Sequence, residues 1–334
     1  MRRYKIVLIA IIGVFFIFLL FRLGFDKESD DSLFGFERIF VKNKELVFDK
    51  KIDLELGVNN LIYPVNDSML ILLDEENRFF FYNLNRQQVD KEKKIIAQQG
   101  FITYADADKF LYIDRYTLNS VSLNNLESNV IETDSISVFS ACYCNDNIYI
   151  FLGYSEKDSI ANVGFYKLDG DVIQLVHNVE NSGCDKDSKF IYDLSYNGNF
   201  LITGNYLIYV CSVKSYMYIF DLNGNYLCTI RTKDNVPSPN ISVFNDTYIY
   251  TRGKTFNSNI GAFIKNDIVY VLSYRFNDEH NVIIDRYSLS DGNYVNSIKV
   301  PELSCANNHI EQLFQMGNFI VFYAQEQLYV FNLL

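Results

Sequence analysis

The sequence predicts an all-β fold, and three observations support that prediction. Phenylalanine and tyrosine, which favour half-buried strands, number 28 and 25 among 334 residues, while tryptophan is absent. Short apolar stretches recur along the chain, with turn residues between them. Six of these stretches end in one marker, an aromatic or aliphatic residue, any residue, and then leucine. The six markers are 82–84, 121–123, 166–168, 220–222, 287–289 and 331–333.

Turn residues follow the first five markers directly. Asp169-Gly170 and Asn223-Gly224 are the clearest, because both positions of a tight hairpin turn require a positive φ. The strands around the markers group into units of four, with a tight turn between the third and fourth strand. Four short antiparallel strands repeated at this spacing are typical of one propeller blade. The sequence therefore predicts a six-bladed β-propeller.

The first three units follow the pattern closely. Strands are expected in the first unit at 61–63, 69–73, 78–84 and 94–96, in the second at 101–104, 110–113, 117–123 and 129–131, and in the third at 136–142, 147–152, 163–168 and 172–176. The shortest marker interval, 39 residues, runs from Leu84 to Leu123. It lies close to the blade period of about 40–50 residues.

The fourth and fifth units carry insertions. The fourth has strands at 200–203, 206–211, 216–222 and 226–230, with 190–192 as an extra strand. In the fifth, 242–250 and 262–264 compete for the innermost strand, followed by 268–274, 282–289 and 294–300. The interval from Leu222 to Leu289 is 67 residues, so seven blades are an alternative. A large sandwich or barrel is the other all-β alternative.

The sixth unit has only three strands, at 310–314, 319–323 and 327–333. A blade without its outer strand leaves an open edge, which natural proteins avoid. The strands near the start, within 36–56, have no unit of their own. We therefore expect residues 36–334 to form the propeller, closed by pairing of 36–56 with the last blade.

The N-terminus predicts one transmembrane helix in residues 1–25, an uncleaved signal anchor. Basic residues precede an apolar run from Ile6 to Phe21, 16 residues long, and acidic residues follow it in a polar spacer at 26–35. Flanking arginines let a run of this length span a membrane. The charge asymmetry places the N-terminus in the cytoplasm and the propeller outside it, in the periplasm or on the cell surface.

At this point the sequence resembles the uncharacterised six-bladed β-propeller proteins of bacterial cell envelopes, which are similar to the TolB-like and NHL-repeat propellers. The resemblance rests on the blade period, the marker with its turn, and the N-terminal membrane segment, and it covers 36–334. It implies binding or scaffolding outside the cytoplasm, or sensing. It implies no functional residue, because the shared residues are structural.

The sequence contains no motif that predicts catalysis, a cofactor or a metal site. Its three histidines, His177, His280 and His309, fall in different units without metal-ligand spacing. The six cysteines form no Cys-x-x-Cys pair, and both buried free thiols and disulfides remain open. A net charge of −11 without a basic block in the body of the chain argues against nucleic-acid binding.

We expect any site on a propeller face, near the central channel, where loops gather. The longest loops are 179–189, 231–240, 252–260 and 275–281, and they make Arg252, Arg275 and His280 the weak binding candidates. The first interpretation is a membrane-anchored binding or scaffolding module for a protein, peptide or glycan. The alternatives are a glycan-active hydrolase or lyase using channel-face carboxylates, and the sensory ectodomain of a signalling system.

Overall fold

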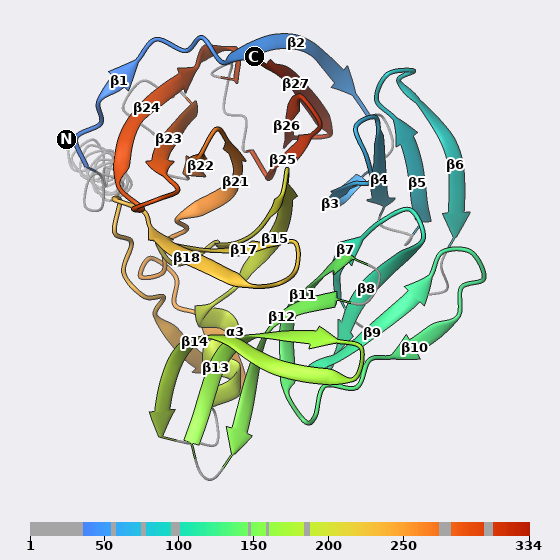
Figure 1. The fold of residues 1–334 in the computed structure, drawn as a ribbon, viewed down its shortest axis with the longest axis vertical. Coiled ribbons are helices and arrows are strands. Elements are labelled where there is room, and N and C mark those ends of the chain that lie inside the picture. Colours follow the sequence, from blue (N-terminus) through green and yellow to red (C-terminus); the bar gives the residue numbers. More distant parts are fainter. Residues whose placement is uncertain are drawn as a thin grey trace, which may run out of the picture. The chain divides into compact units, whose positions relative to one another are not determined.

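A computed structural model of the chain describes residues 36–54, 58–74, 78–94, 101–145, 148–157, 160–183, 188–273, 282–303 and 310–334. The expected anchor at 1–25 and spacer at 26–35 lie outside these residues. Glu37–Leu334 forms one compact unit. Within it the strands form six sheets of at least four strands and one separate two-stranded hairpin. The unit is therefore a six-bladed β-propeller, with the innermost strands β3, β7, β11, β15, β21 and β25 turned toward a common centre (Figure 1).

The blades follow the chain in order. Blade one contains β3 (Val58–Pro64), β4 (Met69–Asp74), β5 (Arg78–Asn83) and β6 (Gln88–Lys94); blade two contains β7 (Phe101–Ala105), β8 (Lys109–Asp114), β9 (Thr117–Ser122) and β10 (Ser128–Val130). Blade three contains β11 (Ser137–Asn145), β12 (Ile148–Lys157), β13 (Ile160–Asp169) and β14 (Val172–Gly183). Blade four contains β15 (Gly198–Thr203), β16 (Tyr206–Cys211), β17 (Tyr216–Asp221) and β18 (Tyr226–Arg231).

Blades five and six include N-terminal strands. Blade five contains β21 (Asn259–Lys265), β22 (Ile268–Ser273), β23 (Val282–Ser288) and β24 (Tyr294–Val300), and the 3₁₀ turn η1 (Pro301–Leu303) follows it. Blade six contains β25 (Gln312–Met316), β26 (Phe319–Ala324) and β27 (Gln327–Leu333). Strand β2 (Leu46–Asp53) pairs antiparallel with β27, with Leu46 opposite Leu333, and supplies the fourth strand. Strand β1 (Phe40–Val41) instead pairs in parallel with β24 of blade five. The stretch 36–56 thus divides between two blades.

Four of the six marker leucines are buried and two, Leu222 and Leu289, are half-buried, because they lie at the end of the third strand of each blade, where neighbouring blades pack. Leu84, Leu123 and Leu168 are fully or nearly fully buried. The predicted hairpins are present, and their glycines, Gly170 and Gly224, have φ of 60° and 76°. The expectation of a positive φ at both turn positions is wrong, because Asp169 and Asn223 do not have one. The recurring marker is therefore part of the core and carries no surface chemistry.

The core consists of apolar layers between blades. Each of six buried clusters draws its members from two neighbouring blades, and together the clusters go once around the ring. The layer between the last and first blades contains Ile52 and Leu54 with Leu70, Phe314 and Val330. Burying this apolar surface, rather than any single bond, joins the two ends of the propeller.

Two expected strands of the sequence interpretation are wrong, and two alternatives that it left open are settled. The extra strand expected at 190–192 lies in the helix α3 (Ser188–Ser195). The fourth strand of blade one occupies Gln88–Lys94, not 94–96, because its exposed polar residues hid it from an apolar pattern. The insertion in the 67-residue interval holds a hairpin, β19 (Ile241–Phe244) and β20 (Thr247–Tyr250), and not a seventh blade; β21 is the innermost strand. Among the described residues, no helix has the length and apolar character needed to cross a membrane.

Candidate binding face at the inter-blade loops

Two insertions depart from the four-stranded repeat, and both enter an innermost strand. Helix α3 lies in the connection from β14 to β15, and the β19–β20 hairpin lies in the connection from β18 to β21. In an up-and-down antiparallel blade, the loop that enters the first strand emerges on the same face as the loop between the second and third strands. The topology therefore places α3, the hairpin and the β8–β9 and β16–β17 turns on one face of the propeller.

Helix α3 is amphipathic, which explains its place on the propeller. Tyr192 and Ser195 are buried, and Tyr192 belongs to the apolar layer between blades three and four together with Tyr196 just beyond the helix. Phe190 and Ile191 lie on the opposite side and are exposed. Buried and exposed residues thus follow the helical period. Because a helix this short is marginal on its own, its packing against the propeller stabilises it more than its intrinsic propensity does.

The two insertions pack against each other. The Tyr250 hydroxyl donates to the Leu194 carbonyl at 2.8 Å, and the rings of Phe190 and Tyr248 stack at 5.4 Å with an interplanar angle of 6°. We call α3 (Ser188–Ser195) and the β19–β20 hairpin (Ile241–Tyr250) together the insertion platform. In the described chain, these are the two insertions into the four-stranded repeat that contain an α-helix or a β-hairpin of their own, and they contact each other.

The outer surface of the insertion platform is apolar. Val243 and Phe244 at the hairpin tip are 59% and 64% exposed, and Ile249 is exposed as well. Strand pairing places Val243 beside Tyr248 on the side of the hairpin that packs on α3, and Phe244 and Ile249 on its other side. Phe190 and Ile191 of α3 are exposed too, although Tyr248 covers part of Phe190. Single exposed apolar residues are ordinary, but several large ones gathered on an insertion are typical of an interaction surface.

A buried loop cluster fixes the base of the hairpin. Asp234, which is almost fully buried, accepts hydrogen bonds from Ser215, Thr232 and Ser258 at 2.9, 2.6 and 3.2 Å. The Val236 backbone N–H donates to the Ser215 hydroxyl at 2.6 Å. Buried carboxylates of this kind are stabilised only when hydrogen-bonded. Ser215 lies just before β17 and Ser258 just before β21, so the cluster ties the loop 231–240 to the propeller, and we assign it a structural role in orienting that loop.

A cavity of about 380 Å³ opens beside α3 at the inner ends of blades two, three and four. Its walls are the start of β7 (Phe101–Thr103), Phe139 and Ser140 of β11, α3 with the turn that follows it, the start of β15, and Tyr209 of β16. All these strand positions belong to the face that carries the inter-blade loops. The cavity therefore lies on the same face as the insertion platform, and Leu194 belongs to both.

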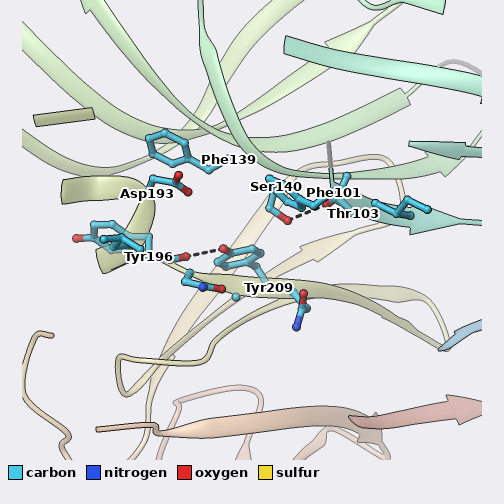
Figure 2. Close-up of a pocket in the computed structure, with 12 residues that line it drawn as sticks. Phe101, Thr103, Phe139, Ser140, Asp193, Tyr196 and Tyr209 are labelled. Carbon is cyan, nitrogen blue, oxygen red and sulfur yellow. Dashed lines mark hydrogen bonds between the residues drawn. The ribbon is translucent and has the colours of Figure 1, made fainter. Parts of the chain in front are cut away.

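Most polar groups of the cavity already have protein partners. The Thr103 hydroxyl lies 3.1 Å from that of Ser140 and also donates to the Ala141 carbonyl at 2.9 Å. The Tyr209 hydroxyl donates to the Tyr196 carbonyl at 2.5 Å (Figure 2). These bonds tie blade two to blade three and α3 to blade four. They hold the cavity walls and leave little capacity for a ligand.

Asp193 is the charged group among the described lining residues. Burial on α3 raises the pKa of its carboxyl from 3.8 to about 6, although the Tyr116 hydroxyl donates a hydrogen bond to the carboxylate. A carboxylate offers about four acceptor positions, so one donor leaves most of them available. In Figure 2 the carboxylate points away from its helix, between Phe139 and Tyr209. Among the described residues that line the cavity, Asp193 is the single charged group.

The weak binding candidates from the sequence do not come together. Arg252 is exposed in the turn after β20 and does not line the cavity. Arg275 and His280 lie outside the described residues. His177 on β14 stacks on Tyr226 at 3.9 Å, and burial lowers its pKa. In the described ranges no three His, Cys, Asp or Glu side chains are close enough to share a metal ion.

The described cysteines carry free thiols. Cys142 and Cys211 are buried, and Cys144 and Cys228 are half-buried. Cys184 and Cys305 lie outside the described residues. Burial raises the pKa of the Cys211 and Cys144 thiols to about 12, so neither is poised to act as a nucleophile.

The sequence interpretation placed a site among the insertions but missed its residues. The expected loop 179–189 is wrong at both ends, because 179–183 belong to β14 and 188–189 to α3, while 184–187 lie outside the described residues. The insertion itself was located, but Asp193, Tyr196 and Tyr209 received no attention. Asp193 follows an apolar triplet that suggested a strand, and no spacing links it to Phe139 or Tyr209. The helical periodicity of 190–196 is a signal that could have placed Asp193 on the same side of a helix as Phe190, three residues earlier.

No family model matches the sequence, and no curated protein matches it. Solved structures with a similar fold include the β-propeller domain of Cps50 (Swd1) from Myceliophteria thermophila, with 8% identity, a TM-score of 0.44, and coverage of 86% of this chain and 100% of that chain. BamB from Moraxella catarrhalis has 10% identity, a TM-score of 0.43, and coverage of 86% and 99%. The computationally designed Ika8 protein has 9% identity, a TM-score of 0.41, and coverage of 87% and 100%.

Proposed function

We propose that this chain is a membrane-anchored, extracytoplasmic binding or scaffolding module whose insertion platform binds a protein partner. The observation that carries the proposal is the group of exposed apolar side chains on two insertions that pack together, Val243 and Phe244 foremost. Propeller loops are held by a rigid scaffold, and binding residues concentrate on such loops. An apolar group on them favours a protein over a glycan, because protein interfaces bury aromatic and aliphatic anchors.

The tether is residues 6–21, which have the apolar length and flanking charges of a signal anchor. A tethered propeller exposes its loops to partners in the same membrane or in the surrounding compartment.

A glycan-active enzyme is the weaker proposal. Glycoside hydrolysis needs two carboxyl groups, about 5–5.5 Å apart for retention or about 6.5–9.5 Å apart for inversion. Among the described lining residues of the cavity, Asp193 is the one carboxyl group. A lyase or hydrolase would need a second acid from a residue that the structure does not describe.

The binding proposal is tested by affinity capture of the full chain from its own membranes. The test variant is Val243→Ser with Phe244→Ser, and the matched control is Val172→Ser, which is 68% exposed on the outer strand of blade three. We expect the wild type and the control to retain the same co-purifying protein, and the double variant to lose it. Equal recovery with all three would contradict the proposal.

The topology is tested by protease access to a C-terminal epitope tag in intact cells. We expect protease added outside the cells to remove the tag while the membrane that holds the anchor stays intact. A tag that is cleaved only after lysis would contradict the extracytoplasmic assignment.

A further inference from the structure

The residues that line the cavity beside α3 have no part in the binding role proposed for the insertion platform. At about 380 Å³ it lies at the lower end of ligand pockets, which span about 300–1,000 Å³. It can hold one side chain or a small molecule, and it is too small for a folded segment. The question is which chemical group its walls would recognise.

The polar walls point to one group. Thr103, Ser140 and Tyr209 are hydrogen-bonded within the protein, so their capacity for a ligand is small. The Asp193 carboxylate keeps free acceptor positions after its bond from Tyr116. A ligand that satisfies these positions must be a hydrogen-bond donor, and a charged donor gains most because the carboxylate lies in a partly dehydrated place.

The charge of Asp193 is not neutralised by the protein. No basic residue is among the described residues that line the cavity. On the elements around it, Lys189 of α3 places its ammonium over the Tyr116 ring at 4.6 Å, and Lys214 of the β16–β17 turn lies over the Tyr196 ring at 3.6 Å. Neither forms an ion pair with Asp193. Burial raises the pKa of the Asp193 carboxyl, and the hydrogen bond from Tyr116 offsets only part of that shift.

The apolar walls are aromatic. Phe139 and Tyr209 are buried and flank the carboxylate, and Phe101 at the rim is 53% exposed. A planar guanidinium binds a carboxylate through two parallel N–H bonds and stacks on aromatic faces, and it is more weakly hydrated than an ammonium. Aromatic rings beside a carboxylate therefore favour arginine over lysine.

We propose that this cavity is a pocket for an arginine side chain of the partner protein, held by the Asp193 carboxylate between aromatic walls. This inference rests on the proposed function, because it supplies the partner with a second point of contact beside the insertion platform. Leu194 lines the cavity and its carbonyl holds Tyr250 of the hairpin at 2.8 Å, so one partner surface can reach both.

The test is a ligand-observed NMR titration of the full chain in detergent micelles with N-acetyl-arginine methylamide. The neutral isostere N-acetyl-citrulline methylamide and N-acetyl-lysine methylamide are titrated in parallel. We expect arginine to bind tightest and citrulline at least about tenfold more weakly, since only a cation pairs with the carboxylate. Equal binding of arginine and citrulline would overturn the proposal.

Asp193→Asn keeps the shape of the side chain and can still accept the Tyr116 hydrogen bond. It should weaken arginine binding at least about tenfold and citrulline binding by a smaller factor, because arginine loses an ion pair and citrulline loses only the negative charge of its acceptor. The matched control is Asp246→Asn at the exposed tip of the hairpin, which should bind arginine as the wild type does. Unchanged binding in Asp193→Asn, with an unchanged melting curve, would overturn the assignment.

Binding should also depend on pH, because a protonated Asp193 cannot pair with a cation. With a carboxyl pKa of about 6, arginine affinity should fall about tenfold from pH 7 to pH 5 in the wild type. The ionisable groups packed around Asp193 are Tyr116, Tyr209 and Tyr250, whose pKa values burial raises, together with Lys189 and Lys214. The pH dependence should vanish in Asp193→Asn, and its persistence there would contradict the role of Asp193.

The outcomes separate this inference from the proposed function. Failure of the arginine titration, with partner capture still dependent on Val243 and Phe244, removes the pocket and keeps the platform. Arginine binding without a captured partner keeps the pocket chemistry and removes the protein-binding role of the platform.

Discussion

Arg38 and Asp285 form a two-point ion pair across 247 positions of the chain. The Arg38 Nε lies 2.8 Å from Asp285 Oδ1, and its Nη2 lies 3.0 Å from Oδ2. Both side chains are almost fully buried, at 7% and 3% exposure. Ser297 also donates to Asp285 Oδ1 at 2.6 Å. The pair attaches the N-terminal segment to blade five just before β1, beside the blade that the same segment completes.

Replacing Arg38 by alanine should destabilise the propeller by about 3–5 kcal/mol, because it leaves the Asp285 carboxylate buried without its cation. The matched control is Arg86→Ala, whose ion pair with Asp90 is solvent-exposed and worth about 0–1 kcal/mol. Urea unfolding followed by circular dichroism measures both. Equal losses in the two variants would show that the buried pair is not a structural attachment.

The marker leucines should behave as core residues. Leu123→Ala removes a fully buried side chain and should cost about 2–5 kcal/mol in the free energy of unfolding. Leu227→Ala, on β18 and 46% exposed, should cost less than about 1 kcal/mol. The same unfolding experiment compares them. A small cost at Leu123 would mean that the repeat marker does not reflect packing between blades.

Asp193 should make stability depend on pH. Its pKa is raised from 3.8 to about 6, so the native state holds this proton more tightly than the unfolded chain does. The stability from that proton is fully present below pH 3.8 and is lost as the pH rises through about 6. Asp193→Asn should therefore be more stable than the wild type at pH 7.5 by on the order of 1–3 kcal/mol, and similar at pH 3.5.

Thermal melting of the wild type and Asp193→Asn across this pH range measures the difference between them. Asp246→Asn provides the exposed control and should show no such trend. A wild type that gains stability relative to Asp193→Asn as the pH rises would contradict the sign argued above.

The buried thiols should resist alkylation. Burial raises the pKa of Cys142 and Cys211, the latter to about 12, and the thiolate is the reactive species. We expect iodoacetamide at pH 8 to leave both unmodified in native protein and to modify both in urea, as mapped by peptide mass spectrometry. Rapid native modification of Cys211 would contradict its burial between blades three and four.

The blades could be predicted because the repeated residues have one structural role each, either packing in the core or forming a turn. Apolar inner strands and positive-φ turns are local in sequence, and Gly170 and Gly224 lie at the expected turns. Outer strands such as β6 were harder, because they expose polar side chains and lack an apolar period. Helix α3 was missed because Phe190-Ile191-Tyr192 has strand-forming side chains, and its helical form depends on packing of Tyr192 into the propeller.

The cavity could not be predicted for a different reason. Phe101, Phe139, Asp193 and Tyr209 belong to three blades and a helix, and only the closing of the ring brings them together. No spacing in the sequence records such a juxtaposition. The insertions showed where the repeat was interrupted, which located the face, while the side chains of the site depended on tertiary structure.

The most direct test of the ring is a cross-link between its two ends. Val47 on β2 lies directly opposite Asn332 on β27, a pairing that places the Cα atoms about 5.5 Å apart or closer, within the range of a disulfide. We expect the full-length Val47→Cys, Asn332→Cys variant to form an intramolecular disulfide under mild oxidation, and each single variant to form none. A double variant that stays reduced, or links only between molecules, would contradict closure of the last blade by the N-terminal strand.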